Sequence, residues 1–184
     1  MISNNYKNNF LKNKNILVTG ASKGIGKCVT ENLSMLGANI IMLSRNEIEL
    51  DKIYDSVKEK YKTKPFIINC DLEDLDESRA QEVADIIFEN YKYLDAVIFN
   101  AAVLEKMSDI VSYDLKTWDK VIKINLTSSF ILSKYLISLM ESSSNPRIIF
   151  TSSSAGKLSQ AFWGAYAISK AGINSLASIL SDEL

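Results

Sequence analysis

The segment TGASKGIG, Thr19–Gly26, follows the short apolar run NILVT, Asn15–Thr19, and precedes a stretch in which apolar residues have helical spacing. Its glycines are Gly20, Gly24 and Gly26. In such a turn one glycine permits the sharp exit from the strand, another lets the backbone approach a pyrophosphate, and a third lets the helix pack closely on the strand. The start of the helix then offers free N–H groups and a positive dipole end to phosphates. The segment therefore predicts a nucleotide-binding turn between a buried strand and a helix.

Outward from this turn, short apolar runs alternate with segments of helical spacing. The runs are continuous rather than alternating, as burial on both faces of a parallel sheet requires. Right-handed crossovers then predict an α/β fold, an open doubly wound parallel sheet with helices on both faces. The expected strands are Asn15–Thr19, Asn39–Leu43, Phe66–Cys70, Ala96–Phe99 and Arg147–Thr151, and the expected helices are Ile25–Leu36, Glu47–Tyr61, Glu77–Tyr91, Leu115–Met140 and Ala165–Leu184.

Length and composition limit the class of protein. The 184 residues suggest one domain, over residues 15–184, preceded by a polar leader at residues 1–14. The net charge of −1 argues against nucleic acid or an anionic membrane as a partner. No apolar run approaches the roughly 20 residues that span a bilayer, and the polar start lacks the apolar core of a signal peptide, so we expect a cytoplasmic protein. The chain has no histidine, and Cys28 and Cys70 are isolated, so no metal site is predicted.

Two residues at the end of the second strand indicate which nucleotide is bound. Folds that prefer NAD usually carry an acidic residue there for the ribose hydroxyls, whereas this chain has Ser44 and Arg45. An arginine can grip a 2′-phosphate in bidentate fashion. Lys23 adds a second cation from the glycine-rich segment, in which Ser22 and Ile25 are further expected contacts. These features favour NADP(H) over NAD(H) as cofactor.

Ser153, Tyr166 and Lys170 form a second group. Tyr166 and Lys170 are four residues apart, so a helix places them on one face, one turn apart. Ser153 follows the fifth strand, at the carboxyl edge of the sheet, where α/β folds bind ligands. A phenol with the ordinary pKa of about 10 is a weak acid–base group at neutral pH, and an ammonium beside it favours the phenolate. We therefore expect Tyr166 to exchange the proton, Lys170 to supply the charge, and Ser153 to hydrogen-bond the substrate oxygen.

Together these motifs resemble the short-chain dehydrogenase/reductase family from Asn15 to Leu184. The family's T-G-x-x-x-G-x-G is TGASKGIG, its Y-x-x-x-K is YAISK, and its upstream serine falls on Ser153. The resemblance implies a Rossmann-like fold and hydride transfer between the nicotinamide of NADP(H) and a small carbonyl or alcohol substrate. It also implies that Tyr166 and Lys170 lie beside the nicotinamide end of the cofactor. Within the family, RIIFTSSSAG…WGAYAISK is similar to the YciK-type bacterial oxidoreductases.

Further site residues are implied by the resemblance alone. Asp71 and Leu72, after the third strand, would contact the adenine, and Asn100 with Ala101, after the fourth strand, would contact the cofactor. Asn125, in KINLTSS, would anchor a water that passes protons to the lysine. The resemblance thus adds Asn125 to the catalytic residues Ser153, Tyr166 and Lys170.

The chain departs from the family pattern in two places. Ala102 stands where the family commonly has a glycine. Complete members also continue with a sixth strand, a Pro-Gly turn, a substrate-covering loop and a seventh strand used in oligomer contacts, and none of these follows Leu184. We therefore expect the last strands of the family fold to be missing, in a fragment or a truncated product. A full-length form is expected to be a homodimer or homotetramer.

Two other functions stay open. A non-catalytic nucleotide-binding sensor or truncated relic is favoured by the missing C-terminal part, whereas the set of Asn125, Ser153, Tyr166 and Lys170 favours an enzyme. An epimerase or dehydratase acting on a nucleotide sugar ranks lower, because such enzymes have longer chains and a different glycine spacing. Trp163, between Ser153 and Tyr166, is a packing residue or part of a substrate pocket.

Overall fold

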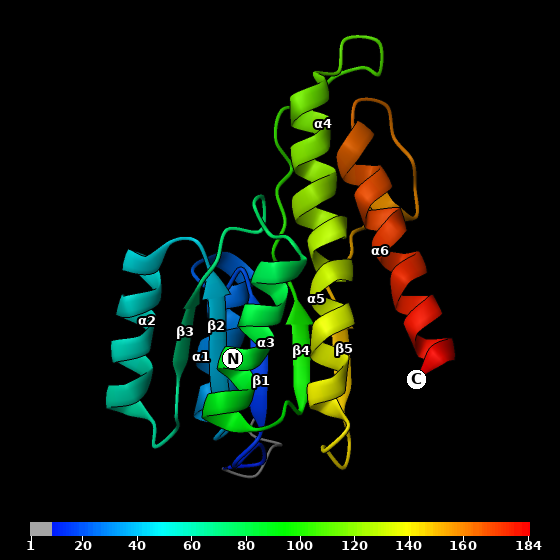
Figure 1. Cartoon of the computed structure of the whole chain (residues 1–184). Coiled ribbons are helices and arrows are strands. Elements are labelled where there is room, and N and C mark those ends of the chain that lie inside the picture. Colours follow the sequence, from blue (N-terminus) through cyan, green and yellow to red (C-terminus); the bar gives the residue numbers. More distant parts are fainter. Residues whose placement is uncertain (1–8) are drawn as a thin grey trace.

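The computed structural model describes residues 9–184 and contains a parallel sheet of five strands in the order β3-β2-β1-β4-β5 (Figure 1). The strands are β1 (Asn15–Thr19), β2 (Asn39–Ser44), β3 (Phe66–Asn69), β4 (Ala96–Phe99) and β5 (Arg147–Phe150). β1 pairs with β2 on one side and with β4 on the other, so the strand order reverses beside β1. The predicted α/β, doubly wound parallel sheet is therefore confirmed, and its ligand-binding switch point lies at the carboxyl ends of β1 and β4.

Helices connect the strands on both faces of the sheet. They are α1 (Gly24–Met35), α2 (Glu47–Lys60), α3 (Glu77–Tyr91), α4 (Leu115–Ile122), α5 (Ser128–Leu136) and α6 (Gly164–Glu183), with a π turn η1 (Lys123–Thr127) and the short 3₁₀ turns η2 (Ile137–Met140) and η3 (Ser154–Gly156). Acceptor side chains cap three of these helices: Asn46 for α2, Asp76 for α3 and Asp114 for α4. Each cap accepts from a backbone N–H that the first turn leaves unpaired.

The predicted long helix over Leu115–Met140 is present, but it is not α-helical throughout. α4, η1, α5 and η2 follow one another without a break, but the π turn interrupts the α-helical hydrogen bonding at Lys123–Thr127. π turns inside α-helices are rare, but those that occur are often found at functional sites. This one contains Asn125, which the family resemblance implies as a catalytic residue.

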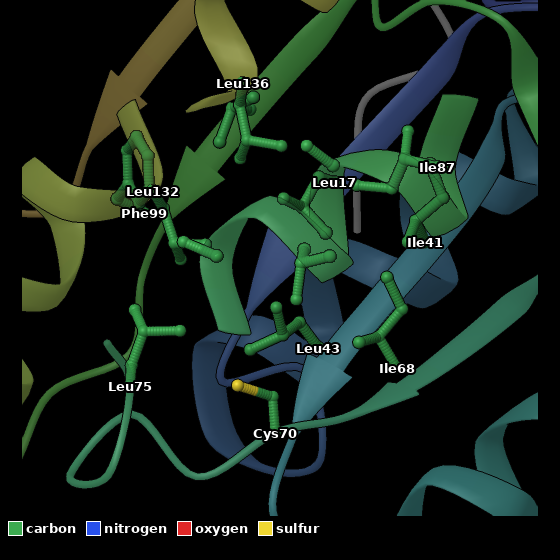
Figure 2. Close-up of a cluster of buried hydrophobic side chains, with 14 of the residues drawn as sticks. Leu17, Ile41, Leu43, Ile68, Cys70, Leu75, Ile87, Phe99, Leu132 and Leu136 are labelled. Carbon is green, nitrogen blue, oxygen red and sulfur yellow. The ribbon is translucent and has the colours of Figure 1, made fainter. Parts of the chain in front are cut away.

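The sheet has an apolar layer on each face, which explains the continuous apolar runs. Ile16, Val18, Ile40 and Met42 belong to a core shared with α1 and α2. Their neighbours in sequence point the other way and pack against α3 and α5. Figure 2 shows this second core, in which Leu17, Ile41, Leu43 and Ile68 of the strands lie with Ile87, Leu132 and Leu136 of the helices.

A buried carboxylate joins elements at the opposite end of the sheet from the glycine-rich turn. Asp95 accepts hydrogen bonds from the amine of Lys14 at 2.8 Å, the backbone N–H of Asn15 at 2.9 Å and the hydroxyl of Ser143 at 2.7 Å. Burial raises the pKa of this carboxyl, but the three hydrogen bonds and the Lys14 charge outweigh burial, and the net pKa is lowered. The carboxylate of Asp95, the residue before β4, therefore ties the start of β1 to the turn before β5.

The structure describes only part of the polar leader predicted at residues 1–14. Residues 1–8 of the predicted leader lie outside the described residues, and the backbone N–H of Leu11 donates to the carbonyl of Leu36 at 2.9 Å. Within the described part of the chain, none of the helices has the length and hydropathy needed to cross a bilayer.

Candidate active site

The three glycines of Thr19–Gly26 differ in what they permit. Gly20 and Gly24 have φ of +66° and +55°, in the left-handed region that favours glycine. A Cβ on Gly20 would lie 2.9 Å from the Cα of Ala101, whereas a Cβ on Gly24 would meet nothing within 4 Å. A Cβ on Gly26 would lie only 2.2 Å from the carbonyl oxygen of Gly20. Gly20 thus forms the turn against the chain after β4, Gly24 leaves open space, and Gly26 lets α1 pack on the loop.

The first turn of α1 has the character of an anion site. Lys23 occupies the N-cap position with extended backbone, and its side chain makes no capping hydrogen bond. No acidic residue lies in the first turn. The dipole and the N–H groups of this helix end are therefore directed at the glycine-rich loop without a competing carboxylate. Such an end suits phosphate groups.

A cleft of about 470 Å³ opens at the switch point of the sheet. The predicted cofactor residues that line it are Gly20, Ser22, Lys23, Gly24, Ile25, Ser44, Arg45, Asp71, Leu72, Asn100 and Ala101. Of the remaining three predicted cofactor residues, Gly26 lies beneath the loop, and Tyr166 and Lys170 lie on α6. Five residues that were not predicted from the sequence also line the cleft: Leu43, Asn46, Cys70, Val103 and Ile124. Leu43, Asn46 and Cys70 could have been found as flanks of predicted residues, because the carboxyl ends of parallel strands meet at one edge.

Ala102, which replaces the common glycine of the resemblance, also lines the cleft. Ala102 is exposed rather than packed inside the fold. Its neighbour Ala101 and Asn100 both donate backbone N–H groups to the hydroxyl of Thr19, at 3.1 and 3.0 Å. These bonds fix the chain after β4 against the end of β1, so the floor of the cleft is built by hydrogen bonds rather than by a glycine at position 102.

Arg45 lies at the mouth of the cleft with a side chain that is 55% exposed. Its Nη1 donates to the Oδ2 of Asp71 at 3.1 Å and lies 4.0 Å from the Oε2 of Glu73. Beside it, the hydroxyls of Ser22 and Ser44 are hydrogen-bonded at 2.9 Å. The structure therefore brings the predicted phosphate ligand Arg45 and the predicted adenine ligand Asp71 together, along with a pair of hydroxyls.

Tyr166 and Lys170 lie together one turn apart on α6, as their spacing predicts. The amine of Lys170 lies 5.9 Å from the centroid of the Tyr166 ring and donates to the carbonyl oxygen of Thr151 at 2.7 Å. Lys170 is only 3% exposed, and this burial lowers the pKa of its amine. The structure therefore places a buried amine beside the ring of a half-buried tyrosine.

Ser153 follows β5 and begins the turn η3. Its Oγ accepts from the backbone N–H of Ala155 at 3.2 Å, which leaves the hydroxyl proton to donate elsewhere. The turn is packed tightly on α6, since a Cβ on Gly156 would lie 2.6 Å from the carbonyl carbon of Lys170. Gly156 therefore holds the Ser153 segment against the helix that carries Tyr166 and Lys170. Sequence reasoning missed this glycine, for which the segment SSSAG gave only a weak signal.

Asn125 is 1% exposed, and its side chain bridges three segments. Its Oδ1 accepts from the N–H of Val103 at 2.8 Å, and its Nδ2 donates to the carbonyl of Val103 at 2.8 Å and to the Oγ of Ser169 at 3.1 Å. Ser169 in turn donates to the carbonyl of Tyr166 at 2.7 Å. Asn125 thus couples the chain after β4 to α6 through its amide.

Comparison with known proteins agrees with this arrangement. The sequence profile of the family described as short chain dehydrogenase matches residues 14–184. The oxidoreductase YciK of Escherichia coli is 34% identical over 177 residues, which cover 96% of this chain and 70% of YciK. The 3-oxoacyl-[acyl-carrier-protein] reductase FabG of Rickettsia conorii is 35% identical over 176 residues, covering 95% of this chain and 68% of FabG.

Comparison with solved structures gives the same result as comparison with related sequences. A short-chain dehydrogenase of Shigella flexneri, in complex with NADP, superposes with a TM-score of 0.93 at 34% identity. The match covers 96% of this chain and 74% of that one. The chain thus spans about two thirds to three quarters of the length of these relatives.

Proposed function

Because the chain belongs to the short-chain dehydrogenase family, we propose that it is an NADP(H)-dependent oxidoreductase that interconverts a carbonyl compound and its alcohol. The observation that carries the proposal is the buried amine of Lys170, 5.9 Å from the centroid of the Tyr166 ring. A pure nucleotide-binding module needs no phenol beside a buried cation. The proposal therefore favours catalysis over a nucleotide sensor that performs no turnover.

The residues of the cleft fit a dinucleotide. The glycine-rich loop and the uncapped start of α1 would hold the pyrophosphate, since Gly24 leaves open space at a helix end that has no acidic residue in its first turn. Asp71 and Leu72 line the part of the cleft proposed for adenine, and Asn100 and Ala101 line its floor. When bound, the cofactor supplies or accepts the hydride.

The residues of the chain would manage the proton and the substrate oxygen. In the reducing direction Tyr166 donates its proton to the oxygen of the carbonyl group while Ser153 donates a hydrogen bond to that oxygen. Lys170 favours the phenolate that remains. Because Val103 and Ser169 accept both N–H groups of the Asn125 amide, its nitrogen would have no donor left for a relay water.

Three observations support NADP(H) over NAD(H). Arg45 has donors left beyond the one that Asp71 accepts, since a guanidinium carries five N–H groups. The Ser22 and Ser44 hydroxyls lie in the same cleft, as does Lys23. The similar Shigella flexneri protein has been solved with NADP. Assembly of the whole protein as a homodimer or homotetramer is proposed only by analogy with the family.

Turnover tests the proposal against the sensor. The purified chain is mixed with NADPH and a set of ketones and aldehydes, and loss of reduced nicotinamide absorbance is followed. We expect turnover that falls about 10²- to 10⁴-fold in Tyr166→Phe, with NADPH binding unchanged. Tyr54→Phe, which removes a hydroxyl from α2, is the matched control and should keep its rate. NADPH binding without turnover in any of these proteins would favour the sensor.

A further inference from the structure

Trp163 is in direct contact with the proposed acid–base group. It is the residue before α6, and its ring centroid lies 5.9 Å from that of Tyr166 with 52° between the ring planes. Trp163 is half-buried, so part of the indole remains accessible. A group bound against this accessible part would lie next to the phenol, where the reacting carbonyl must sit.

The segment before Trp163 is held in a strained backbone conformation that exposes an aromatic ring. Phe162 has φ of +72°, which is unusual for a bulky residue, and it is 58% exposed. Such strain persists only where the surroundings impose it, and it concentrates at ligand sites. Here the carbonyl of Phe162 accepts a hydrogen bond from the N–H of Ser108 at 3.2 Å.

A second contact joins the same two segments. A Cβ on Gly164 would lie 2.6 Å from the Cε2 of Tyr113, so the Tyr113 ring packs directly on the backbone beside Trp163. The two contacts join residues 104–113, after β4, to residues 158–164, before and at the start of α6, and we call the surface of these two joined segments the wall. Both segments lie beyond the carboxyl ends of the strands (Figure 1). Met107, next to Ser108, is 50% exposed on this wall. Leu104 and Leu158 are also exposed on the two segments.

The charges on these segments do not provide a fixed anion clamp. Glu105 is paired with Lys120 at 2.8 Å, and Asp109 accepts from the N–H of Ser112 at 2.9 Å. Lys106 and Lys157 are exposed lysines on flexible stems. The arginines of the chain are Arg45, Arg79 and Arg147, none of them on either segment. Bidentate recognition of a carboxylate or phosphate on the substrate would require an arginine here.

We infer that Trp163 is a specificity-determining residue and that the substrate is an uncharged carbonyl compound with an aromatic or extended alkyl group beside the carbonyl. This inference rests on the proposed function, because it places the reacting carbonyl at Tyr166. The apolar group lies against Trp163, with Phe162 and Met107 farther out on the wall. An aromatic group gains most, since offset or tilted ring contacts add to the burial of apolar area.

Fluorescence gives a direct test that does not depend on turnover. The chain contains two tryptophans, so Trp118→Phe leaves Trp163 as the single tryptophan reporter. This protein is titrated with propiophenone, an uncharged aryl ketone, and with acetoacetate, an anionic ketone, with and without saturating NADP⁺. We expect saturable quenching by propiophenone and none by acetoacetate. Linear collisional quenching by propiophenone, or saturable quenching by both probes alike, would overturn the inference.

Substitution of Trp163 provides the second arm. In equilibrium dialysis, Trp163→Ala should weaken propiophenone binding about 10-fold or more, and Trp163→Phe should restore most of it because a ring remains. Unchanged binding in Trp163→Ala contradicts the inference. A separate NADPH titration distinguishes the two proposals: NADPH binding without ketone binding removes only the substrate class, whereas ketone binding without NADPH binding removes the proposed function.

Discussion

The guanidinium of Arg45 and the carboxylate of Asp71 are joined at 3.1 Å across the mouth of the cleft, from the ends of β2 and β3. Glu73 lies 4.0 Å from the same nitrogen and 3.9 Å from the amine of Lys120. A 2′-phosphate that binds the remaining donors of Arg45 would therefore lie beside two carboxylates that repel it. The side chains are partly exposed, so each of these pairs is worth little by itself.

Glu73→Gln removes one of these carboxylates and leaves every predicted cofactor ligand in place. We expect the Kd for NADPH to fall about two- to threefold and the Kd for NADH to stay unchanged, since only NADPH carries the 2′-phosphate. The preference should shrink as ionic strength rises. Nucleotide fluorescence titration measures both constants. Glu82→Gln, which removes a carboxylate paired with Arg79 on α3, is the control. A parallel change for NADH would show that Glu73 acts elsewhere.

Gly26→Ala should disrupt the junction between loop and helix. Its Cβ would lie 2.2 Å from the carbonyl of Gly20, and backbone cannot move aside cheaply. A cost of about 1 to 3 kcal/mol is expected, which lowers Tm by about 2 to 12 °C in a domain of this size. Gly24→Ala is the steric control, because its Cβ meets nothing within 4 Å and only the φ of +55° opposes it. Circular dichroism melts measure both, and a Gly26→Ala protein more stable than Gly24→Ala would contradict the assignment.

Asn125→Ala should reduce stability as well as activity. The change leaves buried partners on Val103 and Ser169 without the hydrogen bonds of 2.8 to 3.1 Å that the amide provides. Each unsatisfied buried group costs about 1 to 3 kcal/mol, so a loss of about 2 to 5 kcal/mol in the free energy of unfolding is expected. Urea denaturation measures it. Asn174→Ala, which removes one bond of 3.4 Å to Gly156, is the comparison and should cost much less.

Asp95 gives a prediction with a defined pH dependence. Its pKa is lowered in the folded state, so the folded chain binds its proton less readily than the unfolded chain does. The stability it contributes is therefore fully present above the ordinary carboxyl pKa of about 3.9 and is lost as pH falls through the lowered value. Asp95→Asn should cost about 2 to 4 kcal/mol near neutral pH.

The difference in free energy of unfolding between wild type and Asp95→Asn should become smaller as pH falls, over the pH range in which both proteins are folded. Urea unfolding at a series of pH values measures the gap. Asp55→Asn, an exposed aspartate on α2, should change stability by less than about 0.5 kcal/mol at every pH. A gap for Asp95→Asn that stays constant as pH falls would show that its charge is not the stabilising feature.

Much of this fold and site could be predicted from local sequence. Continuous apolar runs identified the strands within about a residue of their ends, and glycine positions identified the turn at Gly20–Gly26, because both signals arise from backbone and burial constraints close in sequence. The spacing of Tyr166 and Lys170 is a property of one helix. These features needed no knowledge of distant contacts.

Other features depend on contacts between segments far apart in the chain. The π turn at Asn125 lies where its amide bonds Val103 and Ser169, which local propensity cannot reveal. The pairing of Arg45 with Asp71 requires the ends of β2 and β3 to be neighbours. The hydrogen bond from the amine of Lys170 to the carbonyl oxygen of Thr151 likewise depends on the packing of α6 beside the end of β5.

An NADP(H) site built by the glycine-rich loop and Arg45 can be tested by titrating the wild-type chain and Arg45→Asp with NADPH and with NADH. We expect tighter binding of NADPH than of NADH by the wild-type chain, and a loss of about 10-fold or more in NADPH affinity in Arg45→Asp. Arg147→Asp, at the start of β5, should behave as wild type. Equal affinity for the two nucleotides, or no binding of either by the folded wild-type chain, would contradict an NADP(H) site of this kind.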